Sequence, residues 1–253
     1  MNKYDVIIIG AGPSGIFCAY ELMRQKPDMK VLMIEKGRSI EKRQCPKRTT
    51  KVCVGCKPCS ITTGFAGAGA FSDGKLSLSP DVGGTLPEIL GYEKAEELIK
   101  EADNIYLKFG ADEKVYGIDD YEAIERIREK AIRANLKLIE CPIRHLGTEE
   151  GYKIYTRLQE HLLASGVEIK FMTMVQDIII VDGVAKGVVT DKEETYYAYL
   201  IVKCWCIVYK FCLVKLLIEF LHDLIADFYP DTYINSTILC FNTMIFTDSF
   251  KPA

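Results

Sequence analysis

The sequence predicts an α/β fold: a parallel sheet built on an N-terminal crossover, with a β-meander added later in the chain. In the first 35 residues, two apolar runs flank a stretch with helical spacing, the pattern of a strand, a crossover helix and a second strand. Four later runs are rich in β-branched and aromatic residues and indicate further strands; they span residues 167–174, 176–181, 184–190 and 195–202. Asp182-Gly183 predicts a tight hairpin turn between the second and third of these runs.

The N-terminal crossover carries a glycine motif in its full setting. The apolar residues 6–9 meet Gly10-Ala11-Gly12-Pro13-Ser14-Gly15, a helix is expected over residues 13–25, and a second strand over 31–35. This is G-x-G-x-x-G between a strand and a helix, with an acid, Glu35, twenty residues after the third glycine. The combination predicts a Rossmann-like domain that binds a dinucleotide. An ordinary βα turn that merely uses glycine is the alternative interpretation.

Each residue of the motif has its own predicted role in binding the cofactor. Gly10 lets the chain turn sharply out of the strand, Gly12 lets the backbone approach a pyrophosphate, and Gly15 lets the helix pack closely on the strand. Pro13 suits the first helical turn, where a missing N–H costs nothing. The helix N-terminus, which includes Ser14, offers N–H groups and a partial positive charge to phosphates.

Glu35 stands where a carboxylate can accept hydrogen bonds from a ribose diol. A 2′-phosphate would be repelled at that position, so the sequence favours FAD or NAD over NADP. The next residue, Lys36, belongs to the same set of candidate cofactor-binding residues.

Residues 36–62 are basic and cysteine-rich, and their weak periodicity predicts an extended loop. Cys45, Cys53, Cys56 and Cys59 give the spacing C-x7-C-x2-C-x2-C, which lets a short loop bring several thiolates to one small centre. Four thiolates suit Zn²⁺ or an iron–sulfur cluster. A redox dithiol that exchanges electrons with a cofactor, and a reduced, exposed loop without a ligand, are the two alternatives.

The segment of residues 64–74 is built almost entirely from small residues. Side chains this small let backbone N–H groups approach a flat ring or a phosphate, so Gly67, Ala68, Gly69 and Ser72 are further candidate cofactor-binding residues. A flexible surface loop is the alternative. The neighbouring Asp73 suits a ligand contact and a turn equally well.

Between this segment and the meander, the apolar spacing predicts three helices and one strand. The helices are expected near residues 98–109, 120–134 and 152–164, with Asp119 as the candidate N-cap of the second and Gly110 ending the first. Residues 136–140 are expected to form the strand. His161 falls on the third helix and is expected at the surface.

Three stretches of the chain resemble the FAD-dependent dehydrogenases of the two-dinucleotide-binding-domain flavoproteins, and in particular an uncharacterised bacterial and archaeal branch of that class. The stretches are residues 5–15 together with 35–38, the cysteines from Cys45-Pro46 to Cys59, and residues 64–76. The similarity extends to about residue 198. The resemblance implies a bound, extended FAD, with residues 64–74 lining its flavin end and the backbone near Val175 contacting its adenine.

The chain departs from this class after residue 202. In the class, such a strand leads into an A-x-G turn, a substrate domain and a late Gly-Asp segment, whereas here Lys203-Cys204-Trp205-Cys206 follow. All 19 glycines lie in residues 1–187, so the tail also differs in composition. We therefore expect a dinucleotide-binding domain over residues 1–202, and an atypical, poorly folded tail over 203–253 that resembles a truncated or shifted reading of a longer protein. No catalytic acid or base is assigned.

Composition limits the partners of the chain. The net charge of −3 without a basic patch argues against nucleic acid, and charged residues interrupt the apolar stretch of residues 200–221, which argues against a membrane span. Ten cysteines and a strand that begins almost at once, without a signal peptide, predict a reducing, cytoplasmic compartment. A small-molecule substrate or electron donor is expected, of unspecified identity.

Three other functions compete with a flavin-dependent oxidoreductase. One is an NAD-dependent enzyme with the same fold, against which the segment at 64–74 argues. Another is a non-catalytic nucleotide-binding fragment whose cysteine loop holds a structural metal or cluster. The third is a sulfide-carrier flavoprotein of the thiamine pathway, which ranks lower because it lacks such a cysteine loop.

Overall fold

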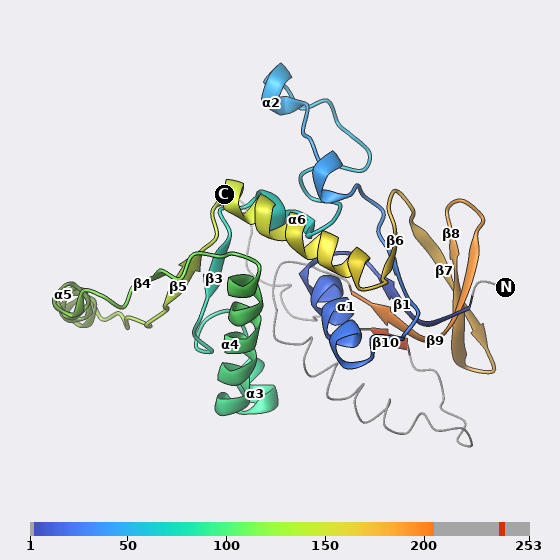
Figure 1. Ribbon diagram of the computed structural model, residues 1–253. Helices are drawn as coiled ribbons and strands as arrows, with labels where there is room; N and C mark the ends of the chain where they lie inside the picture. Colours follow the sequence, from blue (N-terminus) through green and yellow to red (C-terminus); the bar gives the residue numbers. More distant parts are fainter. Residues whose placement is uncertain (1–2, 205–237, 241–253) are drawn as a thin grey trace.

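The computed structural model describes residues 3–204 and 238–240, and its larger sheet, the central sheet, has seven strands (Figure 1). The order of six strands is β6-β2-β1-β9-β8-β7, and β10 pairs with β9. The strands are β1 (Lys3–Ile9), β2 (Val31–Ile34), β6 (Glu168–Lys170), β7 (Val175–Val181), β8 (Val184–Thr190), β9 (Thr195–Lys203) and β10 (Ile238–Cys240).

The centre of the sheet is parallel and fully buried. Ile7 of β1 lies beside Leu32 of β2 and Ile201 of β9, and none of the three is exposed. Strands covered on both faces need continuous apolar runs, which is why these sequences do not alternate. The predicted parallel α/β fold is therefore confirmed.

Strands β7, β8 and β9 form the predicted meander, because each pairs antiparallel with the next. Asp182 and Gly183 connect β7 to β8 with φ values of +54° and +77°. Two consecutive positive φ angles define the hairpin turn that best matches the twist of the strands, and they explain the Asp-Gly pair. The run of 167–174 forms only the short strand β6, followed by non-strand residues up to β7.

Helices α1 (Pro13–Gln25) and α6 (Thr148–Ala164) pack together on one face of this sheet, as Figure 1 shows. They bury Phe17 and Tyr155 against Tyr106 of α4 (Tyr92–Lys108), with ring centroids 5.4 and 6.1 Å from that of Tyr106. The remaining helical segments are η1 (Ile40–Lys42), α2 (Lys47–Thr50), η2 (Gly67–Phe71), α3 (Leu86–Leu90) and α5 (Tyr121–Arg133).

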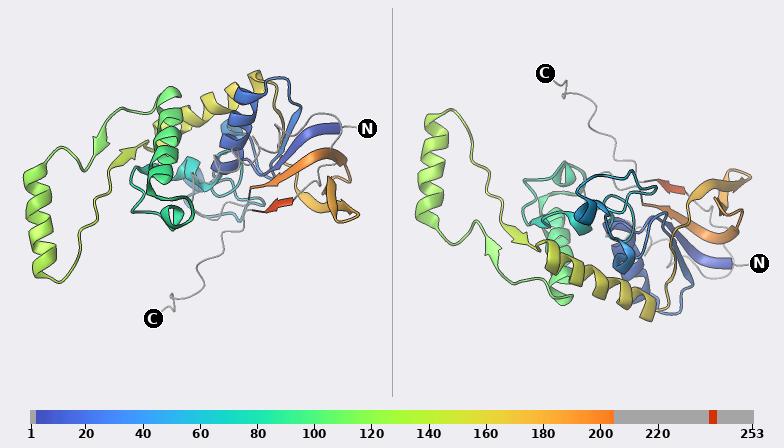
Figure 2. Two further views of the ribbon diagram at one scale, coloured as in Figure 1. Left: turned by 90° about the horizontal axis from the view of Figure 1, so that it is seen from below. Right: turned by 90° about the horizontal axis from the view of Figure 1, so that it is seen from above.

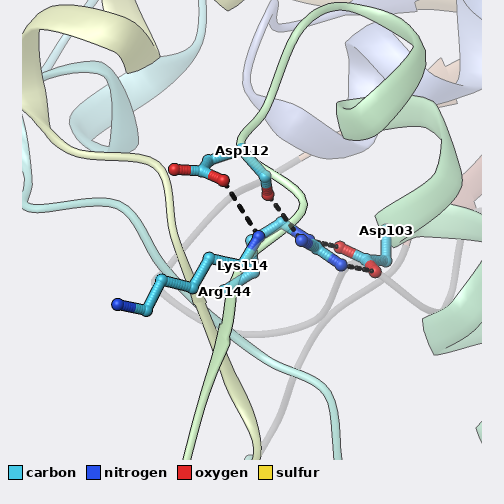
Figure 3. Close-up of polar contacts among 4 residues, drawn as sticks. All are labelled: Asp103, Asp112, Lys114 and Arg144. Carbon is cyan, nitrogen blue, oxygen red and sulfur yellow. Dashed lines mark hydrogen bonds and ion pairs between the residues drawn. The ribbon is translucent and has the colours of Figure 1, made fainter.

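A second, smaller sheet has the order β3-β5-β4 and is formed by Lys75–Ser77, Ile143–His145 and Val115–Tyr116. Arg144 of β5 ties it to α4: its Nε and Nη2 donate to the two carboxylate oxygens of Asp103 at 2.5 and 2.8 Å. The Nη1 of Arg144 donates to the carbonyl oxygen of Asp112 at 2.5 Å, and Figure 3 shows the group. The Asp103 carboxylate raises the pKa of the Arg144 guanidinium.

Residues 117–142 leave this small sheet and return to it, and we call them the arm. Helix α5 lies at the far end of the arm, away from the central sheet in both views of Figure 2. None of the thirteen residues of α5 is buried. Its N-cap is Asp120, whose carboxylate accepts from the Ala123 N–H at 2.8 Å, so the prediction of Asp119 was wrong by one residue.

Two other local predictions were wrong. Residues 136–140 do not form a strand; the nearest strand is β5, three residues later. His161 is not simply a surface residue, because its ring packs 5.4 Å from that of Tyr20 and 5.3 Å from that of Phe109. Beyond Cys204, the three-residue strand β10 is the described part of the tail, and the other predictions for residues 205–253 lie outside the described residues. Among the helices of the described part, none is long and apolar enough to cross a bilayer.

Candidate dinucleotide-binding site

The motif glycines lie where β1 passes into α1, at the carboxyl end of the parallel strands. Gly10 has a φ of +101° and donates its N–H to the Ile34 carbonyl oxygen at 2.8 Å. A methyl carbon placed on Gly15 would lie 2.0 Å from the Gly10 carbonyl oxygen, so only glycine lets the helix approach the strand this closely. A methyl carbon on Gly10 would lie 2.7 Å from the Cys204 carbonyl oxygen, where the chain leaves β9.

Helix α1 begins without a capping side chain. Its N-cap is Gly12, in an extended conformation with φ −73° and ψ 177°, and Pro13 follows at the first helical position. Among the residues that the structure describes, no side chain caps this first turn, so the N–H groups of Ser14 and Gly15 are available as donors for another acceptor. Together with the helix dipole, they favour an anion at this position.

Glu35 follows β2 directly and is buried, with 6% of its surface exposed. Its Oε2 accepts from the Ala11 N–H at 2.8 Å, and its Oε1 accepts from the Gly37 N–H at 2.8 Å. The carboxylate is therefore held at the glycine turn by two backbone donors. Since an ionised carboxylate offers about four acceptor sites, it retains the capacity to accept ribose hydroxyls.

The small-residue segment lies against the same turn. The Ala66 N–H donates to the Ala11 carbonyl oxygen at 2.8 Å. A methyl carbon on Gly67 would lie 3.7 Å from both Gly12 Cα and Pro13 Cδ. The structure thus brings together two segments more than fifty residues apart in sequence, and the second flanks the start of α1.

The candidate cofactor-binding residues within this segment differ in their exposure and in their hydrogen bonds. Gly67, Ala68 and Gly69 belong to η2, and Ala68 is exposed. The hydroxyl of Ser72 donates to the Gly69 carbonyl oxygen at 2.9 Å and accepts from the Gly74 N–H at 3.1 Å, so here it closes a turn.

Two further candidates lie close to Glu35 in the fold. Lys36 is exposed beside the site. Val175 is the first residue of β7. The segment that leads to it passes beside Glu35, as the hydrogen bond from the Thr173 N–H to the Glu35 carbonyl oxygen at 3.1 Å shows.

Arg43 is a residue of the candidate site that the sequence analysis missed. It is 3% exposed and contacts the small-residue segment. Its guanidinium donates to four carbonyl oxygens, those of Ser60 at 3.0 Å and of Ile61, Phe65 and Gly67 at 2.6 Å each. One side chain therefore holds the end of the cysteine loop and the wall of the site together. A single arginine in a basic loop carries no sequence signal of this role.

Burial lowers the pKa of the Arg43 guanidinium to about 10, an effect opposed by the negative charges of Glu35 and Cys59. The group still carries its charge at neutral pH. The ring of Phe71 lies 4.7 Å from the guanidinium carbon and shields it further.

The structure does not bring the four loop cysteines together. Cys53 and Cys59 are exposed, Cys45 and Cys56 are partly exposed, and none of the four is in a disulfide. Over residues 3–204 and 238–240, no three potential metal ligands among His, Cys, Asp and Glu are close enough to hold an ion. The thiolate of Cys59 has a lowered pKa, because the N–H groups of Thr62 and Ile61 and the Thr62 hydroxyl donate to it.

Comparison with known proteins supports the N-terminal part of this site. Residues 1–41 match the profile of the Thi4 family. Over 33 residues the chain is 52% identical to the thiamine thiazole synthase of Coprinopsis cinerea, a match that covers 13% of this chain and 10% of that protein. The matched family segment holds the whole G-x-G-x-x-G unit and Glu35, and it ends before Cys45. It agrees with the predicted dinucleotide-binding crossover.

Several solved structures have a similar arrangement at low sequence identity. The L-amino acid deaminase of Proteus vulgaris is 14% identical, with a TM-score of 0.47, over 81% of this chain and 47% of that chain. The 3-ketosteroid-Δ4-(5α)-dehydrogenase of Rhodococcus jostii RHA1 is 18% identical, with a TM-score of 0.49, over 80% and 45%. The THI4 protein of Thermovibrio ammonificans is 13% identical, with a TM-score of 0.41, over 80% and 57%. The chain thus spans about half the length of these proteins.

The sheet order and the geometry of the glycine turn define the class of protein: an α/β protein with a Rossmann-type dinucleotide-binding domain. The sequence match over residues 1–41 supports the same class.

Proposed function

We propose that this chain is the cofactor-binding portion of a flavin-dependent oxidoreductase and that its N-terminal crossover binds FAD. The observation that carries the proposal is the convergence of three groups on Ala11: Glu35 accepts its N–H at 2.8 Å, Ala66 donates to its carbonyl at 2.8 Å, and α1 starts beside it without a side-chain cap. Candidate binding groups for a pyrophosphate and for a ribose, and a second wall for the cofactor, therefore lie together at one place.

Different residues would bind different parts of the cofactor. The first-turn amides of α1 would hold the pyrophosphate, Glu35 would hold the ribose diol, and the backbone of residues 66–69 would line the cofactor beyond the turn. The flavin, when bound, supplies the redox chemistry by accepting or giving a hydride or electrons. The protein contributes position and electrostatics, and the Arg43 hydrogen bonds hold residues 65 and 67 in place for that purpose.

The residues 64–74 favour FAD over NAD as the ligand, because the resemblance to the flavoprotein class assigns this segment to the flavin end. We propose a small-molecule substrate, no nucleic acid or membrane as partner, and the cytoplasm as the compartment.

The test is an absorbance spectrum of the purified full chain, followed by titration with FAD, NAD and ADP. Flavin absorption in the visible, or tight binding of added FAD with competition by ADP, supports the proposal. A chain that binds NAD and not FAD would point to the NAD-dependent alternative. A chain that binds neither FAD nor ADP contradicts the proposal.

A metal or cluster on Cys45, Cys53, Cys56 and Cys59 stays a prediction, and so does a redox dithiol. As arranged here, the four thiols do not form a metal site, so no step of the mechanism is assigned to one. Zinc and iron analysis of anaerobically purified protein tests the metal, and its absence removes that hypothesis. A bound flavin that dithionite reduces and NAD(P)H does not would favour a non-catalytic nucleotide-binding chain.

A further inference from the structure

The arm, residues 117–142, exposes more apolar surface than its size explains. Six of the twenty exposed large hydrophobic side chains of the described residues lie in it: Ile118, Tyr121, Ile127, Ile132, Leu136 and Ile139. Ile127 is 53% exposed and Ile132 is 67% exposed. A cluster of this kind on a projecting element is typical of an interaction surface.

Helix α5 is amphipathic although none of its residues is buried. Ala123, Ile124, Ile127, Ala131 and Ala134 recur at intervals of three and four residues and share one face, on which Ile127 is the exposed large side chain. The charged residues occupy the rest of the helix surface, together with Tyr121 and Ile132. A helix in water gains nothing from such a stripe unless another surface covers it. Small alanine side chains on both sides of Ile127 would let a second helix come close.

The charges of the arm are ordered along its length. On the charged face, Arg126 pairs with Glu122, Arg128 with Glu125 and Arg133 with Glu129, so these charges are largely compensated. Among the described residues, Asp119 and Asp120 at the start of α5 have no ion pair, and neither do Lys130 and Lys137 toward its end. An order of acidic residues before basic residues also suits the dipole of the helix itself, so the charge order alone requires no partner. Combined with the apolar stripe, the charge order favours a partner whose charges run in the opposite direction.

We propose that the apolar stripe of α5 docks against α5 of a second copy of this chain, with the two helices antiparallel. In that arrangement Ile127 meets Ile127 of the other copy near the two-fold axis, and the uncompensated acids of each helix start face the uncompensated lysines of the other. A parallel arrangement would bring the acids of the two copies together. The helix is about 20 Å long at 1.5 Å per residue, so the contact is small and the dimer is weak and salt-sensitive.

The first experiment is analytical ultracentrifugation of the full chain over a range of concentrations and salt. The wild-type chain is expected to dimerise, and Ile127→Glu to weaken the dimer at least about tenfold, because the substitution puts two carboxylates at the axis. Ile89→Glu is the matched control: Ile89 is 58% exposed but lies on α3, outside the arm, and its substitution should leave the dimer unchanged. A wild-type chain that stays monomeric, or a dimer that Ile127→Glu does not weaken, overturns the proposal.

The second experiment tests the charge pairing between the two copies through charge reversal. Variant one is Asp119→Lys with Asp120→Asn, which keeps a good N-cap; variant two is Lys130→Glu with Lys137→Glu. Each variant alone places like charges together and is expected to lose the dimer, while an equimolar mixture of the two restores it as a heterodimer. Failure of the mixture to associate, with both variants folded by circular dichroism, overturns the charge pairing between the two helices.

Discussion

The Ala66 N–H donates to the Ala11 carbonyl oxygen at 2.8 Å, and this hydrogen bond joins the two segments that flank the candidate cofactor site. The Ala11 N–H, on the same peptide turn, donates to Glu35 at 2.8 Å. Ala11 has no functional group of its own, yet its backbone connects the crossover, the acid and the small-residue segment.

Substituting Glu35 should weaken nucleotide binding and change its selectivity. Glu35→Ala is expected to cost about 1.5–3 kcal/mol of ADP binding, the contribution of hydrogen bonds to a charged group. It should also narrow the preference for ADP over its 2′-phosphorylated form, because the repelling charge is removed. Titration calorimetry with both ligands measures the ratio, and unchanged affinity and selectivity would remove the assigned role.

Gly15→Ala should destabilise the protein although alanine is the better helix former. The added methyl carbon would lie 2.0 Å from the Gly10 carbonyl oxygen, so α1 must move away from β1. We expect a loss of about 1–3 kcal/mol of unfolding free energy, as for overpacking. Gly151→Ala in α6 is the control: its methyl carbon would meet Leu146 at 4.0 Å, and helix propensity predicts a gain of up to about 1 kcal/mol. Urea denaturation of both variants checks the opposite signs.

Substituting Arg43 should weaken nucleotide binding indirectly, because Arg43 holds the small-residue segment in place and does not contact the nucleotide. Arg43→Met leaves four carbonyl oxygens without their donor and is expected to cost about 3 kcal/mol of stability, as when a buried polar network is broken. In the variant that remains folded, the amide of Ala66 should exchange with deuterium faster and ADP should bind more weakly. Arg48→Ala removes an exposed arginine whose guanidinium lies 5.5 Å from the Phe71 ring, and should leave both unchanged. Normal ADP affinity and normal exchange at Ala66 in Arg43→Met would argue against this role.

Cys59 should react as a thiolate below the usual pH for cysteine. Donation from the N–H groups of Thr62 and Ile61 and from the Thr62 hydroxyl lowers its pKa. The pH profile of its alkylation by iodoacetamide, followed by mass spectrometry, should therefore have a midpoint below the ordinary value for a cysteine thiol. Thr62→Val removes the hydroxyl and should move the midpoint upward. A wild-type midpoint at or above the ordinary value would refute the expectation.

The Arg144–Asp103 pair should be required for the docking of the small sheet on α4. The side chains are 5% and 12% exposed, so Arg144→Ala leaves a carboxylate nearly buried without its partner. We expect a loss of about 3–5 kcal/mol, larger than for an exposed ion pair. The double variant Arg144→Met with Asp103→Leu should recover part of it, because both charges are then absent. Thermal unfolding of the single and double variants provides the comparison, and equal losses would contradict the ion-pair explanation.

The sequence predicted the parts of this fold that depend on local signals. The helix at 13–25, the strand at 184–190 and the Asp182-Gly183 turn agree with the structure, because periodicity and turn chemistry act over a few residues. The strand expected at 136–140 was wrong, because those apolar residues lie in the arm and have no neighbouring strand to pair with.

The same division holds for the site. Gly10, Gly15 and Glu35 have a fixed spacing that the sequence shows directly, and the structure brings them together. Arg43 could not be found in this way, because its role depends on carbonyl groups at residues 60, 61, 65 and 67, which carry no side-chain signature. His161 was misplaced for a similar reason: the rings that cover it come from α1 and the end of α4.

The position of β9 beside β1 has a consequence for how this chain is made. Ile7 pairs in register with Ile201, so the strand that begins the nucleotide fold finds one of its two neighbours only after nearly two hundred more residues have been synthesised. At a translation rate of about 5–20 residues per second, one edge of β1 stays unpaired for roughly ten to forty seconds during synthesis. Pairing over such a sequence distance is slow to nucleate, and the unpaired edge of β1 is a template for aggregation. The nascent chain should therefore depend on chaperones until residue 203 has left the exit tunnel.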